Sequence, residues 1–80
     1  MKFNAIKIAD VAGNEQCVDL SKQLGNYLYC YAHDEEISTT GRAIYNGEDV
    51  AITDALRDAI GKAVAGYPYI FRNAIMKLIE

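Results

Sequence analysis

The residues that could carry chemistry in this sequence gather in its middle, over residues 30–42. Cys30 and His33 are three positions apart near the expected end of a helix, a spacing that lets both side chains reach one metal ion. Asp34 or Glu35 would be the third ligand. The competing interpretation is a solvated histidine that the helix dipole and the neighbouring carboxylates favour. Because the chain has only one histidine and two cysteines, we expect no metal and no cofactor.

The same cysteine and histidine do not make a nucleophilic pair. Spacing on one helix brings the two side chains together, but it supplies neither an oxyanion hole nor a third group to orient the base. We therefore expect no catalytic residue and no enzymatic activity.

The best candidate for a small-ligand site is the run Ser38, Thr39, Thr40, Gly41 and Arg42. It places hydroxyls, a glycine and a guanidinium at the expected start of a helix, where free amides and the positive end of the dipole can hold an anion. It is not a P-loop, since no Gly-Lys-Ser or Gly-Lys-Thr follows at the required spacing. The alternative interpretation is ordinary capping of the helix by a hydroxyl.

Tyrosine is the abundant aromatic residue, with six in 80 residues. It supplies a large rigid contact area with a polar tip, which interfaces favour. Helical periodicity assigns Tyr27 and Tyr31 to the core and leaves Tyr29 and Tyr69 outside the core stripes, together with Met76. We expect Tyr29, Tyr69 and Met76 to lie at a partner surface. The alternative is that these are scattered exposed apolar residues without a role.

A β-hairpin is expected before these residues. Apolar and β-branched residues predict a strand over 3–11, and residues 15–18 follow as a return strand. Gly13 and Asn14 can take the positive φ of the tight turn between them. Val50 and Ile52 alternate with other residues, so a third short strand against the hairpin is an open alternative.

Four short helices should pack on the hairpin, giving an α+β fold. The expected signals are Asp19 as the cap of a helix over 20–32, Ser38 or Thr39 as the cap of a helix that ends before Gly47, Thr53 as the cap of the third helix, and Pro68 at the start of the fourth after Gly66. Gly25 in the first helix suggests that another element passes close to it, because a glycine there costs about 1 kcal/mol relative to alanine.

The core faces of three helices follow from their periodicity. The predicted stripes are Leu20, Leu24, Tyr27, Leu28 and Tyr31; then Leu56, Ala59, Ile60, Ala63 and Val64; then Phe71, Ala74, Ile75 and Leu78. On the first helix, Lys22, Asn26 and Tyr29 fall on the face opposite to its stripe.

Composition limits the classes of function. Residues 1–80 form one domain, whose net charge of −3 argues against nucleic acid as a partner. No apolar run of membrane-spanning length or secretory leader occurs, so we expect a cytoplasmic protein, with Cys17 and Cys30 reduced and buried. A core this small supplies only about 3 to 5 kcal/mol, and oligomerisation is the expected source of further stability.

Two stretches, 19–29 (DLSKQLGNYLY) and 41–53 (GRAIYNGEDVAIT), resemble parts of small uncharacterised proteins encoded by phages and prophages of gut bacteria. They cover about a third of the chain and include no catalytic motif. The resemblance implies a phage or mobile-element product, a setting in which small proteins often assist assembly or bind a host component.

The sequence thus predicts a non-enzymatic interaction protein that acts as a homo-oligomer, with a host or phage protein as a further partner. The alternative is a protein that binds or sequesters a nucleotide-type anion at residues 38–42.

Overall fold

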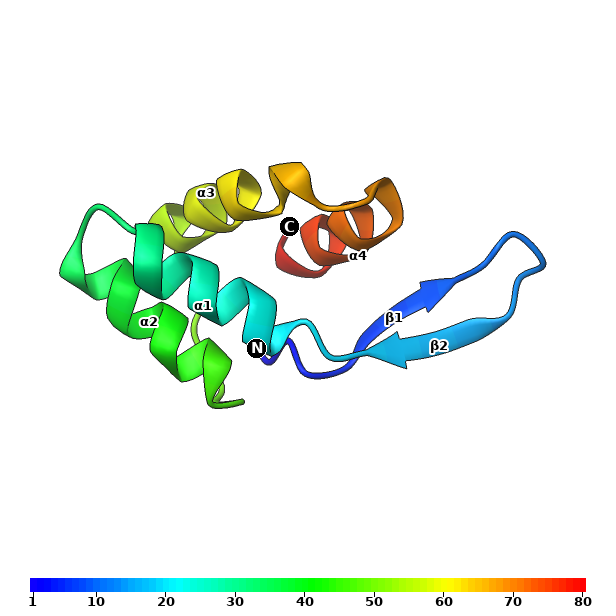
Figure 1. Cartoon of the computed structure of the whole chain (residues 1–80), viewed down its shortest axis with the longest axis horizontal. Helices are drawn as coiled ribbons and strands as arrows, with labels where there is room; N and C mark the ends of the chain where they lie inside the picture. The colour runs from blue at the N-terminus through cyan, green and yellow to red at the C-terminus, as the bar shows by residue number, and fades with distance from the viewer.

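The computed structural model describes all 80 residues, and Figure 1 shows the course of the chain. The elements, in chain order, are β1 (Ile6–Ala9), β2 (Glu15–Val18), α1 (Ser21–Tyr31), α2 (Glu35–Tyr45), α3 (Asp54–Ala63), the 3-10 turn η1 (Val64–Gly66) and α4 (Tyr69–Ile79). An antiparallel hairpin therefore precedes four helices, as the sequence predicts.

The hairpin has the expected turn. Its strands pair with Ile6 opposite Val18, and Gly13 takes a φ of 89°. Asn14 does not share this positive φ, contrary to the prediction. Instead its amide N–H donates to the carboxylate of Asp10 at 2.9 Å, which holds the turn from the other side.

The first strand is shorter than predicted, with residues 6–9 paired in place of 3–11. Phe3 is buried ahead of the strand, and its carbonyl accepts the amide N–H of Leu20 at 3.1 Å. At the other end, Val11 is fully exposed in the turn. Pairing is therefore confined to the part of the hairpin between these two residues.

Helix α1 begins one residue beyond the predicted boundary. Leu20 occupies the N-cap position and is buried in the core, so Asp19 lies outside the helix. The Asp19 carboxylate still accepts the amide N–H of Ser21 at 2.9 Å, together with its hydroxyl. Asp19 therefore bonds to the first turn of α1 as predicted, but the N-cap residue is Leu20 and not Asp19.

The buried face of α1 also differs from the predicted stripe. Leu24, Gly25 and Leu28 are buried, whereas Tyr27 and Tyr31 are 40% and 67% exposed. The two tyrosine rings pack on each other, with centroids 4.9 Å apart. Because α2 packs on the Gly25 side of α1, burial shifts toward that side and away from the two tyrosines.

Helix α2 begins at Glu35 and not at Ser38 or Thr39. The Asp34 carboxylate accepts the amide N–H of Ile37 at 2.8 Å and is the true N-cap. Glu35 and Glu36 lie in the first turn of α2, where negative charge suits the helix dipole. The predicted stop at Gly47 is confirmed, with a φ of 77°.

The segment between α2 and α3 forms no third strand. The Val50 amide donates to the Met1 carbonyl at 2.9 Å, and the N-terminal ammonium donates to the Val50 carbonyl at 3.0 Å. This segment thus pairs with the N-terminus and not with the hairpin. Thr53 caps α3 as predicted, its hydroxyl accepting the Leu56 amide N–H at 3.1 Å.

The last two helices match the predicted order of Gly66, Pro68 and α4, but the face of α4 is partly wrong. Ile75 and Ile79 are its buried residues, whereas Leu78 is 44% exposed. Residues four apart lie on one face of a helix, so Ile75 and Ile79 mark the face of α4 that packs against the other elements. Leu78 lies beside it.

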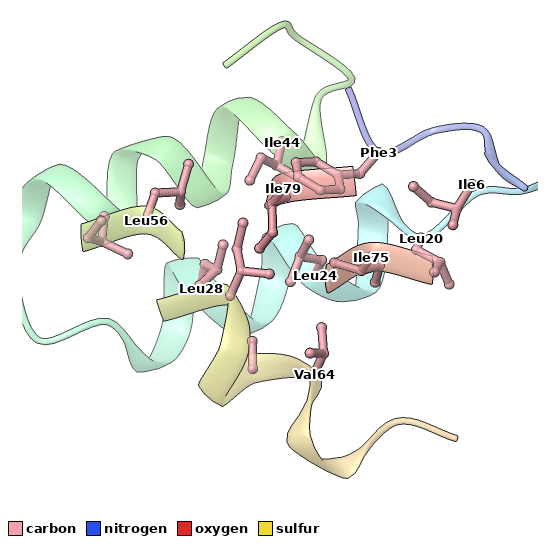
Figure 2. Close-up of a cluster of buried hydrophobic side chains, with 13 residues drawn as sticks. Phe3, Ile6, Leu20, Leu24, Leu28, Ile44, Leu56, Val64, Ile75 and Ile79 are labelled. Carbon is pink, nitrogen blue, oxygen red and sulfur yellow. The ribbon is translucent and has the colours of Figure 1, made fainter. Parts of the chain in front are cut away.

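One cluster of 13 buried hydrophobic residues joins β1, the four helices and η1. Figure 2 shows Leu24 and Leu28 of α1 within this cluster, with Ile44 of α2 and the two isoleucines of α4 around them. The α3 stripe contributes as predicted, through Leu56, Ile60, Ala63 and Val64.

The molecule is elongated, with extents of 42 × 21 × 20 Å. The helices gather around the core, and the hairpin projects from them on one side (Figure 1). Only its base, at Ile6, is fully buried.

Candidate functional site

Two glycines bring α1 and α2 into main-chain contact. A Cβ atom on Gly25 would lie 2.5 Å from the amide nitrogen of Tyr45 and 2.6 Å from the carbonyl oxygen of Gly41. A Cβ atom on Gly41 would lie 2.6 Å from the amide nitrogen of Tyr29. No side chain fits at either position, which confirms that another element passes close to Gly25. The cleft between the helices is therefore floored by backbone.

Each helix contributes a tyrosine and a cation above this floor. The Arg42 guanidinium donates to the Tyr29 hydroxyl at 2.9 Å, and its Cζ lies 5.0 Å from the centre of that ring. Lys22 Nζ donates to the Tyr45 carbonyl at 2.9 Å and lies 4.2 Å from the centre of the Tyr45 ring. Neither cation forms an ion pair with a carboxylate. Arg42 is thus held by the ring and hydroxyl of Tyr29, and Lys22 by the ring and carbonyl of Tyr45.

Both tyrosines and Arg42 border a surface hollow of about 340 Å³, which we call the tyrosine groove. Its lining residues are Gly25, Asn26, Tyr29, Arg42, Tyr45 and Asn46. None of them is acidic and none is aliphatic, although the whole chain carries a net charge of −3. The groove combines aromatic faces, amide groups and positive charge.

The predicted anion site over Ser38–Arg42 does not lie at a helix start. The Ser38 amide already donates to the carbonyl of the N-cap residue at 3.2 Å, and the Ser38 hydroxyl donates to the Tyr29 carbonyl at 2.9 Å. The Thr40 hydroxyl likewise donates to a carbonyl one turn earlier, at 2.9 Å. The free amides on which the prediction depended are absent at these positions, because the helix begins earlier.

The other members of that segment separate in space. Gly41 is buried against α1, Thr39 is exposed, and Arg42 alone lines the tyrosine groove. The exposed face predicted for α1, with Lys22, Asn26 and Tyr29, is confirmed.

Sequence reasoning missed Tyr45 as part of this site. Tyr45 joins the site because α2 packs against the Gly25 side of α1. The sequence signal for this packing was the pair of mid-helix glycines, Gly25 and Gly41.

The three predicted interface residues lie in three different surface hollows. Tyr29 lines the tyrosine groove, and Tyr69, which is 67% exposed, lies at the start of α4 beside the hairpin. Met76 is half-buried and packs against the core beside Gly61 of α3. The structure thus does not bring these residues together into one patch.

A second surface lies between the hairpin and α4, and we call it the hairpin–α4 surface. It encloses about 350 Å³ and is lined by Ile8, Ala9, Asp10, Gln16, Pro68, Tyr69, Ile70 and Phe71. Tyr69 and Ile70 are exposed, and Asp10 is the single charged residue among them. This surface is mainly apolar, unlike the tyrosine groove.

Both cysteines are exposed, so the expectation that they are buried is wrong. Cys17 is on the hairpin opposite Lys7, and Cys30 lies on the outer side of α1 with its Sγ 3.7 Å from Asn26 Oδ1. No three His, Cys, Asp or Glu side chains gather in a way that could hold a metal ion, and His33 is exposed.

Hydrogen bonding and burial shift the pKa of three side chains. The amide N–H of Asn14 lowers the pKa of Asp10, and the hydroxyl and amide of Ser21 lower the pKa of Asp19. Burial raises the pKa of Tyr67, whose hydroxyl has no hydrogen-bond partner. The two aspartates act in turns that fix the hairpin and the entry to α1.

No protein-family model, curated protein or solved structure matched this chain. None of the helices has both the length and the apolar character needed to cross a membrane.

Proposed function

We propose that this protein acts by binding and not by turnover, as a homo-oligomer whose simplest form is a two-fold dimer joined through the hairpin–α4 surface. The observation that carries this proposal is the exposed apolar character of that surface, with Tyr69 and Ile70 beside a hairpin that projects from the helices (Figure 1).

The part of the hairpin farthest from the helices lacks cover from its own chain. An isolated two-stranded hairpin is marginally stable in water, and here the turn lies beyond the helices with Val11 fully exposed. The accessible surface of 5175 Å² exceeds the roughly 4,800 Å² typical of a compact monomer of this mass. A partner over the hairpin would bury part of this excess.

A second copy suits this surface better than a charged partner. Asp10 is its only charged lining residue, so two copies can meet there without strong repulsion despite the net charge of −3. Both hairpin strands also have one unpaired edge, because the sheet contains only β1 and β2. A two-fold axis places such a surface against itself.

A host or phage protein as a further partner, and the phage setting that the resemblance implies, stay predictions. In such a complex the dimer would present two copies of every exposed face, which raises avidity without new contacts.

Light scattering coupled to size exclusion tests the dimer. We expect twice the 8.8 kDa chain mass for the wild type at micromolar concentration, and the monomer mass for Ile70→Glu. Leu78→Glu is a matched control, since Leu78 lies on the same helix and has the same 44% exposure as Ile70, outside the hairpin–α4 surface. This control should stay dimeric.

Thermal melts of Ile70→Glu and Leu78→Glu check that both variants fold. A wild type that is folded and monomeric at these concentrations would contradict the proposal. So would dissociation of both variants to the same extent, because the contact would then not be specific to the hairpin side of α4.

A further inference from the structure

We infer that the tyrosine groove binds a small organic anion that carries a planar ring, of the nucleoside monophosphate type. This site lies on α1 and α2, shares no lining residue with the hairpin–α4 surface, and does not depend on the proposed dimer.

The anion would be held by Arg42 and Lys22. Arg42 lines the groove, and Lys22 lies next to it, against the ring and carbonyl of the lining residue Tyr45. Neither has a carboxylate partner, whereas Arg57 and Lys62 elsewhere in the chain are paired with aspartates. An arginine can give two parallel hydrogen bonds to a phosphate, and lysine adds a point charge. The groove contains no acidic residue that would oppose this binding.

The planar part of the ligand would lie on the tyrosine rings. Tyr29 and Tyr45 are 45% and 42% exposed and both line the groove, so each offers ring surface to a ligand. Aromatic side chains stack on nucleobases of every type, because each base has a π-face. Asn26 and Asn46 also line the groove, and their amides can donate to and accept from the edge of a heterocycle.

The side chains of the groove are already held in place. Arg42 is bonded to the Tyr29 hydroxyl, the backbone of Tyr29 accepts from the Ser38 hydroxyl, and Lys22 is bonded to the Tyr45 carbonyl. A site whose residues are fixed before binding loses less conformational freedom when the ligand arrives.

The composition and size of the groove argue against an apolar helix or peptide as its occupant. Such a ligand needs aliphatic contacts, and the lining has none. The volume of about 340 Å³ lies near the lower end of the range of about 300 to 1,000 Å³ for small-molecule sites.

Isothermal titration at low ionic strength tests this inference. The probes are AMP, GMP, CMP and UMP, with adenosine and inorganic phosphate as the two separate halves of AMP. We expect at least one monophosphate to bind with a Kd below about 1 mM, and both halves of AMP to bind more weakly than AMP itself if AMP is the ligand.

Two arginine variants then locate the site. Arg42→Gln should weaken binding at least about tenfold, because it removes a charge-assisted hydrogen bond. Arg72→Gln is the matched control, since the Arg72 guanidinium also lies against a tyrosine, 5.6 Å from the centre of the Tyr69 ring, outside the groove. It should bind as the wild type does.

Three results would overturn the inference. The first is that no monophosphate binds with a Kd below about 1 mM. The second is that Arg42→Gln and Arg72→Gln weaken binding equally. The third is that adenosine or inorganic phosphate binds as tightly as AMP. Melts of Arg42→Gln establish that any loss of binding is not a loss of fold.

Discussion

The α1–α2 pair and the hairpin lie on opposite sides of the molecule and are held in different ways (Figure 1). The two helices touch through their main chains at Gly25 and Gly41, above a core that buries Leu24 completely. The hairpin is anchored at its base by Ile6, and Val11 in its turn is fully exposed. One region is fixed by internal packing, and the other leaves apolar surface uncovered.

The two proposals made for these regions follow this difference. Segments with few buried apolar contacts open locally at low free-energy cost, whereas packed core elements open only with the whole protein. A preformed small-ligand groove suits the α1–α2 pair, and an interface with a partner that supplies the missing cover suits the hairpin.

The largest expected effect is in the core beneath the helix pair. Leu24→Ala should destabilise the fold by about 2 to 5 kcal/mol, because it leaves a cavity at a side chain with no exposed surface. Tyr29→Ala should cost well under half of that, since Tyr29 is half-exposed on the outer face. Denaturant melts measure both, and equal losses would show that the outer face of α1 is as important for stability as the inner one.

The glycine contact gives the next effect. Gly25→Ala should cost about 3 kcal/mol, the upper part of the range for overpacking, because the new methyl group meets main-chain atoms that cannot move aside. Gly66→Ala is the control, since a Cβ there meets nothing within 4 Å. If the two variants melt alike, the helices are not in main-chain contact as described.

The smallest expected effect is the loss of stability at acid pH in the hairpin turn and at its junction with α1. Folded Asp10 has a lowered pKa, so its contribution to stability is complete above the unfolded value of about 3.8 and disappears as the pH falls through the lower folded value. Asp19 behaves in the same way at the entry to α1. Acid should therefore loosen the hairpin turn and its junction with α1 through these two groups.

NMR titration of the Asn14 and Ser21 amides follows the two carboxylates, because each amide donates to one of them. Both midpoints should lie below the ordinary aspartate value, and Asp10→Asn should abolish the Asn14 transition. A midpoint at or above the ordinary value would contradict the hydrogen bonding described for the turn.

Some features could be located from the sequence because they depend on a few neighbouring residues. The turn at Gly13, the cap at Thr53 and the stop at Gly47 each follow from the backbone freedom or hydrogen bonding of a single residue. Within α3, the regular spacing of apolar residues predicted the buried face correctly.

Competing local signals explain the wrong start of α2. Asp34 and Ser38 are both good N-caps, and the sequence alone does not rank them. The earlier cap places Ile37 inside the helix, where its side chain is buried in the core. Burial of that side chain favours the earlier of two starts that local chemistry allowed, so Ser38–Arg42 do not lie at the helix start on which the anion-site prediction depended.

The amino-acid sequence by itself determined the order of the elements, the hairpin and the positions of most turns, since these depend on interactions within a few residues. Only the tertiary structure decided which faces are buried. Tyr27 and Tyr31 are on the predicted core stripe, yet they are exposed because α2 approaches α1 on the side of Gly25. The same approach placed Arg42 and Tyr45 of α2 next to Tyr29 of α1 and so formed the tyrosine groove, because residues distant in the sequence become neighbours only when helices pack.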